Sequence, residues 1–294
     1  MTRGRGGDDD KGRVGEKKTV PAGPTNREPA VDHLVEVWTS VASACDRLGP
    51  GQWDLPTDCP GWTVRDQLSH LIGIERMLLG EAPPPPLEVL PEHVRNGYAE
   101  LNEPWVEARR RQPGNVVLSE FISVTGRRIH ELRTLPPEAF DVRSWSPVGE
   151  VPYRDFLATR ILDCWAHEQD IRRALGRPGG RNGVGEQAVL DRCERTMAYV
   201  VGKRVAPPDG TTVRFVVTGV LGRQVAVAVE GGRAETVVAD GSESTTTVIV
   251  DQDTFWRLGF GRLEPARALA SGQARVVGDI ALGHRVLDSM AFMT

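Results

Sequence analysis

The sequence lacks three features that would each point to a class of partner. Its net charge is only −4, with 36 basic and 40 acidic side chains, so no broad basic face is present to neutralise nucleic-acid phosphates. No apolar run approaches the roughly 20 residues that span a bilayer, and the N-terminus is charged where a signal peptide has its apolar core. We therefore expect a cytoplasmic protein with neither a nucleic-acid nor a membrane partner.

Cysteine is also scarce. The chain has four cysteines and no CxxC spacing, which indicates neither a disulfide framework nor a structural zinc cluster. We expect four free thiols, at Cys45, Cys59, Cys164 and Cys193.

The composition is that of a globular protein, with 39% hydrophobic and 26% charged residues, and a length of 294 suits two modest domains better than one. Residues 1–28 are rich in Gly, Arg, Asp and Lys, and they carry too little apolar surface to offset the entropy of folding. We predict a disordered tail over 1–28, an all-α four-helix bundle over 29–200, and a small α+β domain over 208–294.

Four segments have apolar residues at the three-and-four spacing of amphipathic helices, which is the number that a bundle needs. The second begins with Thr63 and Asp66, which are spaced as a capping box. The last ends at Gly176, shortly before Pro178. The predicted helices span residues 32–48, 63–80, 116–135 and 152–176.

After residue 208 the chain changes to short β-branched segments separated by Gly-containing turns. These segments predict a small, largely antiparallel sheet, followed by short helices. The predicted strands are 212–218, 224–229, 235–239 and 245–250. Helices are expected near 254–258, near 265–270 and from 280 onward, with 275–278 as an intervening segment.

Three residues of the helical domain are candidate metal ligands. Asp163 and His167 are four apart on one predicted helix, so their side chains can converge on one ion; a surface hydrogen bond between them would have the same spacing. His70 lies among apolar residues of the second predicted helix, either as a satisfied core histidine or as a ligand that points into the bundle. Together the three would make a site with an open fourth position, which is the catalytic pattern for zinc.

Two segments carry a family resemblance. Residues 59–70 (CPGWTVRDQLSH) and 163–172 (DCWAHEQDIR) resemble the two signature stretches of the mycothiol-dependent maleylpyruvate isomerase family, within the DinB-like superfamily of four-helix bundles. The resemblance implies a divalent metal, most simply Zn²⁺, bound by His70, Asp163 and His167. The family enzyme has Glu where this chain has Asp163, which shortens the reach of that ligand by one methylene.

The resemblance also implies a chemistry. In such proteins the metal binds mycothiol, the low-molecular-weight thiol of actinobacteria, and holds it as a thiolate. An isomerase would add that thiolate to an activated double bond and so permit cis–trans rotation, whereas a transferase would use it to displace or add. Residues 255–258 and 278–283 resemble the sterol-carrier-like C-terminal domain of these proteins.

Three functional hypotheses follow. The first is a metal-dependent enzyme, an isomerase or S-transferase, that takes mycothiol and a small electrophilic substrate. The second is a non-catalytic or regulatory protein that keeps the fold, the metal and a small-molecule site, with a homodimer as an option. The third is a bundle without metal, in which His70 and His167 are ordinary core residues.

Several other polar residues have a structural interpretation. Asp170 either orients a ligand imidazole or forms a salt bridge to Arg173 or Arg160. Cys164 is a competing ligand. Trp62 and Trp165 are expected to pack in the bundle. The residues treated as surface or capping groups are Glu75, Glu168, His33, His93, His130 and His284.

Overall fold

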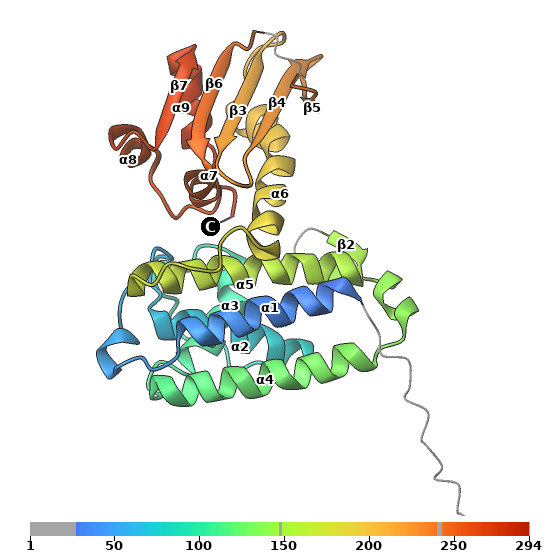
Figure 1. Ribbon diagram of the computed structural model, residues 1–294, viewed down its shortest axis with the longest axis vertical. Helices are drawn as coiled ribbons and strands as arrows, with labels where there is room; N and C mark the ends of the chain where they lie inside the picture. The colour runs from blue at the N-terminus through green and yellow to red at the C-terminus, as the bar shows by residue number, and fades with distance from the viewer. Residues whose placement is uncertain (1–27, 147–148, 240–242, 294) are drawn as a thin grey trace, which may run out of the picture.

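The computed structural model describes residues 28–146, 149–239 and 243–293. They form a helical bundle and a second part built on a sheet, joined by helix α6 (Val184–Tyr199) (Figure 1). The predicted architecture, an all-α bundle followed by an α+β domain, is confirmed. The predicted tail lies outside the described residues, apart from Glu28.

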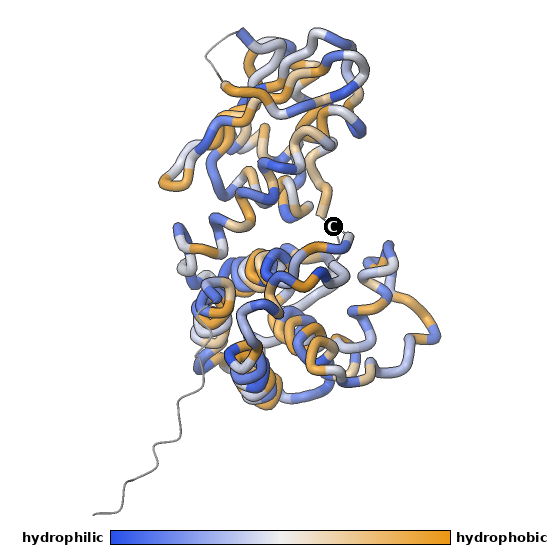
Figure 2. Tube along the Cα trace, turned by 90° about the vertical axis from the view of Figure 1, so that its right-hand side faces the viewer, coloured by the Kyte–Doolittle hydropathy of each residue, from blue (hydrophilic) through white to orange (hydrophobic). Residues whose placement is uncertain are grey.

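The bundle consists of four long helices that match the four predicted ones. Each helix buries its apolar side in the bundle and carries polar residues on its other side. Hydrophobic (orange) and hydrophilic (blue) residues therefore alternate along the helices in Figure 2. Helix α1 packs on α5, and α2 packs on α4 and α5. No helix in the described ranges is long and apolar enough to cross a bilayer. The helices are α1 (Pro29–Ala44), α2 (Val64–Leu78), α4 (Gly114–Thr134) and α5 (Tyr153–Leu175).

Several short elements were not predicted. Helix α3 (Gly97–Glu107) contains Pro104 in its interior, which weakens the helical signal of its sequence. Helix α6 was missed although Val189, Cys193 and Met197 repeat at four residues on its buried side. The remaining unpredicted elements are the short helices η1 (Pro50–Gln52), η2 (Pro137–Asp141) and η3 (Val200–Val205), and the hairpin of β1 (Arg143–Ser146) and β2 (Gly149–Pro152).

The second part is a five-stranded sheet in the order β5-β4-β3-β6-β7, in which only β3 and β6 run parallel. Burial alternates along β3, where Val213, Phe215 and Val217 are buried, so one face of the sheet is covered. Helices α6, α7 and α9 pack against the sheet. Its elements are β3 (Thr212–Thr218), β4 (Arg223–Glu230), β5 (Arg233–Val237), β6 (Thr246–Asp251), α7 (Gln252–Gly259), α8 (Pro265–Ala270), β7 (Ala274–Gly278) and α9 (Ile280–Asp288).

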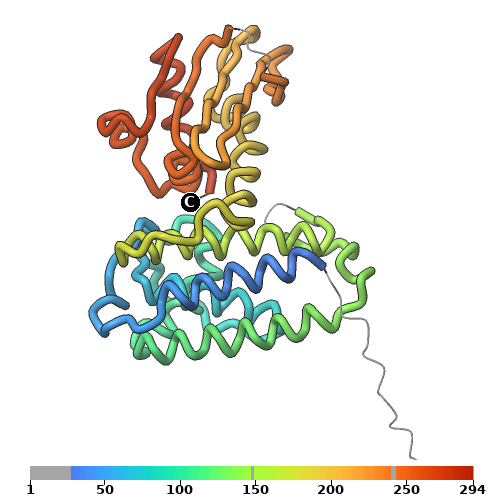
Figure 3. Tube along the Cα trace, viewed as in Figure 1, coloured from blue at the N-terminus to red at the C-terminus, as the bar shows by residue number. Residues whose placement is uncertain are grey.

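The second part rests on helix α5. Trp165, which was expected to pack and not to stack on substrate, is buried, and its ring meets Trp256 of α7 edge to face with centroids 5.4 Å apart. Ion pairs add to this contact, among them Arg173 with Asp253 at 3.1 Å. The last described residues also return toward this junction (Figure 3), where the amides of Phe292 and Met293 donate to the carbonyl of Gly259, at the end of α7. We propose a domain boundary near residues 200–208. Helix α6, which comes before it, packs both on α5 and on the sheet and so joins the two parts.

The close packing of α3 on α2 gives a testable prediction. A Cβ at Gly73 of α2 would lie 2.5 Å from the Trp105 Cβ, whereas a Cβ at Gly126 of α4 would meet nothing within 4 Å. Both glycines are inside helices, so alanine should gain about 0.5–1 kcal/mol of helix propensity at either position. We expect Gly126→Ala to stabilise the protein and Gly73→Ala to destabilise it by about 1–3 kcal/mol through overpacking. Urea unfolding of the two variants measures the difference, and equal stability would contradict the packing described.

Candidate metal centre

His70 is placed by the start of helix α2. Thr63 caps the helix: its hydroxyl accepts a hydrogen bond from the Asp66 amide, and the Asp66 carboxylate accepts one from the Thr63 amide at 2.9 Å. This reciprocal bonding is the predicted capping box. Two turns further along, the imidazole of His70 points toward α5 and its side chain is only 6% exposed.

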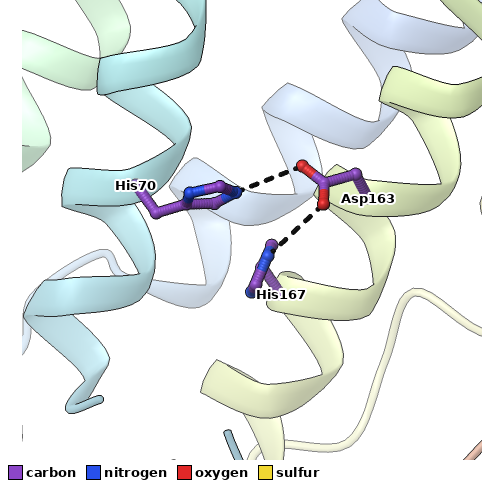
Figure 4. Close-up of side chains that lie close together, drawn as sticks. All are labelled: His70, Asp163 and His167. Carbon is purple, nitrogen blue, oxygen red and sulfur yellow. Dashed lines mark hydrogen bonds and ion pairs between the residues drawn. The ribbon is translucent and has the colours of Figure 1, made fainter. Parts of the chain in front are cut away.

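Asp163 and His167 lie one turn apart on α5 and face His70 (Figure 4). The Asp163 carboxylate stands between the two imidazoles: Oδ2 is 3.4 Å from Nε2 of His70, and Oδ1 is 3.5 Å from Nε2 of His167. One candidate ligand atom from each residue lies within 4.8 Å of the others. The structure therefore brings together the three residues that the sequence singled out.

The spacing and chemistry of these donors fit a zinc-like cation. Two ligand atoms at 2.0–2.1 Å from zinc and at a tetrahedral angle are roughly 3.3 Å apart. Each imidazole Nε2 lies near this distance from a different oxygen of Asp163, 3.4 Å from Oδ2 for His70 and 3.5 Å from Oδ1 for His167. Two imidazoles and one carboxylate form a donor set that Zn²⁺ accepts, with one position left for a further ligand. Asp163 is the most accessible of the three side chains, at 26% exposure.

Electrostatics keep both kinds of donor in the form that binds a cation. Burial lowers the pKa of His70 to about 4, despite the nearby Asp163 carboxylate, so the imidazole is neutral at neutral pH. Burial alone would raise the pKa of Asp163, but Arg160 and His167 outweigh it and hold that pKa well below its usual range. The site thus places the neutral imidazole of His70 beside an ionised carboxylate.

The tautomer of His167 is set by Gln67. The Gln67 amide nitrogen donates to the Thr57 hydroxyl at 2.6 Å, which turns its carbonyl oxygen toward Nδ1 of His167, and that nitrogen donates to it. Because Nδ1 is engaged by Gln67, Nε2, the ring nitrogen nearest Asp163, is the one that could bind a cation. Nδ1 of His70 has no hydrogen-bond partner among the described residues.

Trp62 forms an aromatic wall beside both imidazoles, with its ring centroid 5.0 Å from that of His70 and 5.8 Å from that of His167. Its indole Nε1 donates to the buried Glu103 at 3.0 Å, and the same carboxylate lies 3.1 Å from Nε2 of His93. The interpretation of His93 as a surface or capping group is therefore wrong. Because His93 and Trp62 both contact Glu103, His93 links the segment after α2 to Trp62.

Glu75 was also expected at the surface, and this prediction is wrong. It is 1% exposed and bonds to both Arg128 and Arg160. A signal was present in the sequence, since Glu75 follows Leu68 and Leu71 at seven and four residues and so falls on the apolar stripe of α2. Glu168 is buried as well, bonded to Ser40 and Arg172, whereas His130 and His284 are exposed and His33 is half-buried.

Asp170 pairs with an arginine of the second part. Its fully buried carboxylate accepts from Nε of Arg262 at 3.1 Å, so the predicted bridge to Arg173 or Arg160 is wrong. Oδ2 of Asp170 also lies 3.7 Å from Nδ1 of His167. Through Asp170, Arg262 therefore links the second part of the chain to the candidate ligand His167. No local sequence pattern predicts this contact.

The cysteines are free thiols, as expected. Cys164 accepts a hydrogen bond from the Trp38 indole at 3.3 Å and is not in the donor set. Cys59, in the loop before α2, is only half-buried. Burial nevertheless raises its pKa to about 11, against the lowering effect of Arg262.

A testable prediction follows for Cys59. Raising its pKa from 9.0 to about 11 makes the thiolate fraction at pH 8 roughly 100-fold smaller than that of a free thiol. We expect iodoacetamide to alkylate the native protein slowly, at Cys59 alone, with a rate that keeps rising up to about pH 11. Mass spectrometry of wild type and Cys59→Ser measures this. Rapid labelling at pH 7 would mean that Cys59 is an activated nucleophile.

Comparison with known proteins places both halves of the chain. Residues 34–172 match the family described as the mycothiol maleylpyruvate isomerase N-terminal domain, and residues 193–288 match the SCP-2 sterol transfer family. Uncharacterized proteins of two Mycobacterium tuberculosis strains are 26% identical over 167 residues, which cover 55% of this chain. The match spans 63% of the length of those relatives.

Solved structures with similar folds include the mycothiol-dependent maleylpyruvate isomerase, at 13% identity and a TM-score of 0.49 over 80% of this chain and 89% of that one. A sterol carrier protein 2-like protein of Aedes aegypti is 16% identical, with a TM-score of 0.27 over 35% of this chain and 93% of that one. By these two matches, residues 34–172 form a mycothiol maleylpyruvate isomerase N-terminal domain, and residues 193–288 form an SCP-2 sterol transfer domain.

Proposed function

We propose that this protein is a metal-dependent, mycothiol-using isomerase or S-transferase that acts on a small electrophilic substrate, with His70, Asp163 and His167 as the metal ligands. The observation that carries the proposal is the position of the Asp163 carboxylate, 3.4 and 3.5 Å from Nε2 of the two imidazoles. The membership of residues 34–172 in an isomerase domain family supports the thiol and the reaction class.

A divalent cation at this site, most simply Zn²⁺, would lower the pKa of a coordinated thiol so far that it is held as a thiolate at neutral pH. The chain's own residues prepare for this. Gln67 keeps the proton of His167 on Nδ1, Arg160 helps to keep Asp163 ionised, and Trp62 excludes water from one side of both imidazoles. Because none of the four cysteines is in the donor set, the nucleophilic sulfur would come from the small thiol.

The approach of a ligand is constrained by exposure. The imidazoles of His70 and His167 are 6% and 8% exposed, against 26% for Asp163, so the thiol and its electrophile would enter on the Asp163 side. The second domain reaches the same region through the Arg262–Asp170 pair. We infer that the SCP-2-like domain encloses the organic part of the substrate, for which a small apolar or lipid-like molecule is the class that its family supports.

The first test is metal content. We expect protein loaded with Zn²⁺ and then desalted to retain about one equivalent, and both His70→Ala and His167→Ala to retain much less, because each removes one of three protein ligands. Elemental analysis measures the stoichiometry, with His130→Ala as a matched control at an exposed position. A wild-type protein that holds no metal would leave His70 and His167 as core residues.

The second test is turnover. Wild-type protein, mycothiol and a panel of electrophiles, including maleylpyruvate, should give product only in the metal-loaded state. Mass spectrometry separates the two reaction classes, because an isomerase returns the thiol unchanged and an S-transferase leaves it in the product. Metal binding with no product from any electrophile would favour the alternative, a non-catalytic protein that binds metal and a small molecule.

A further inference from the structure

A chain of alternating charges crosses the bundle and ends on the candidate ligand Asp163. Arg128 of α4 donates from Nε to Glu75 of α2 at 3.1 Å, and Glu75 accepts from Nε and Nη2 of Arg160 on α5 at 3.1 and 2.8 Å. Arg160 then donates from Nη1 to Oδ2 of Asp163 at 2.5 Å. Three helices therefore contribute to the position of one carboxylate.

The charged side chains of this network are buried, where an unpaired charge would be strongly destabilising. Glu75 is 1% exposed, Arg128 2% and Arg160 6%. Charges in such surroundings are stable only when each is paired and hydrogen-bonded. Arg128, Glu75 and Arg160 each have a partner of opposite sign on both sides, because Arg128 also pairs with Glu131. Nη2 of Arg128 donates in addition to the Tyr153 hydroxyl.

The guanidinium of Arg160 has little freedom. Two of its nitrogens are held by a single oxygen of Glu75, and because the group is planar, these bonds also fix the direction of Nη1. The bond from Nη1 fixes Oδ2 of Asp163 in turn, while Oδ1 faces His167. The aspartate side chain is thus held in one rotation about its last bond.

We propose that Arg160, braced by Glu75, is a positioning residue that makes Asp163 a one-oxygen metal ligand. The inference rests on the proposed metal site. It accounts for an aspartate at a position where the sequence resemblance leads one to expect the longer glutamate: Arg160 holds Oδ2, which leaves Oδ1 as the oxygen that would bind a cation.

If Arg160 acted on the site only through its positive charge, the opposite effect on metal binding would be expected. A guanidinium next to a cation site repels the cation, so removing its charge should tighten metal binding if charge were all that Arg160 contributed. If Arg160 positions the ligand, removing it should weaken binding in spite of the relieved repulsion. Weaker metal binding after the substitution would therefore indicate a positioning role, and tighter metal binding would indicate charge repulsion alone.

The experiment is a Co²⁺ titration of the metal-free full-length protein, followed by visible absorption. We expect Arg160→Gln to weaken Co²⁺ binding by about 10–100-fold, which is the usual effect of losing a residue that orients a metal ligand. The absorption bands should also lose intensity, because a carboxylate free to bind through both oxygens raises the coordination number. Arg172→Gln is the matched control: it removes the same charge from α5 at a buried pair with Glu168, and it should leave both affinity and spectrum unchanged.

Affinity in Arg160→Gln that equals or exceeds that of wild type would overturn the positioning role while leaving the metal site intact. Wild-type protein that binds no Co²⁺ would overturn the metal site and this inference together. If Arg160→Gln does not fold, Arg160→Lys serves instead, because lysine keeps the charge but cannot bridge Glu75 and Asp163 with a planar fork. The same weakening and the same spectral change are expected, and wild-type behaviour of Arg160→Lys would again reject the proposal.

Discussion

The carboxylate of Asp163 is shared by His70, His167 and Arg160, and this sharing links the packing of the bundle to the chemistry of its candidate site. A carboxylate among buried side chains stays ionised only if the energy of its lost hydration is replaced. Arg160 supplies much of that replacement, and Arg160 is itself stable in the interior only because of Glu75. The positions of α2, α4 and α5 are therefore constrained by charge pairing as well as by apolar packing.

The second half of the chain enters the same network from the other side. Asp170 lies one turn after His167, is fully buried and is paired with Arg262. Without Arg262 this carboxylate would be a buried charge with little compensation, which is a costly arrangement. The docking of the SCP-2-like domain on α5 thus also completes the surroundings of His167, whose Nδ1 lies close to both Gln67 and Asp170.

What the sequence could and could not predict follows from the range of each interaction. Asp163 and His167 were predictable because helical spacing alone puts them on one face, and His70 because it lies among apolar residues. Glu75 lies on the apolar stripe of α2 and was misjudged, because a buried glutamate needs arginines that come from two other helices. Arg262 lies 92 residues from its partner Asp170, and no local pattern predicts this pairing. Helix α3 was hidden by its internal proline.

X-ray absorption at the zinc K-edge would test the central claim most directly, namely that two imidazoles and one aspartate form a centre open to a small thiol. For zinc-loaded wild-type protein we predict a first shell of nitrogen and oxygen alone at about 2.0–2.1 Å, with one sulfur at about 2.3 Å appearing when mycothiol is added. A sulfur in the shell before any thiol is added, or none after saturation with mycothiol, would contradict the account.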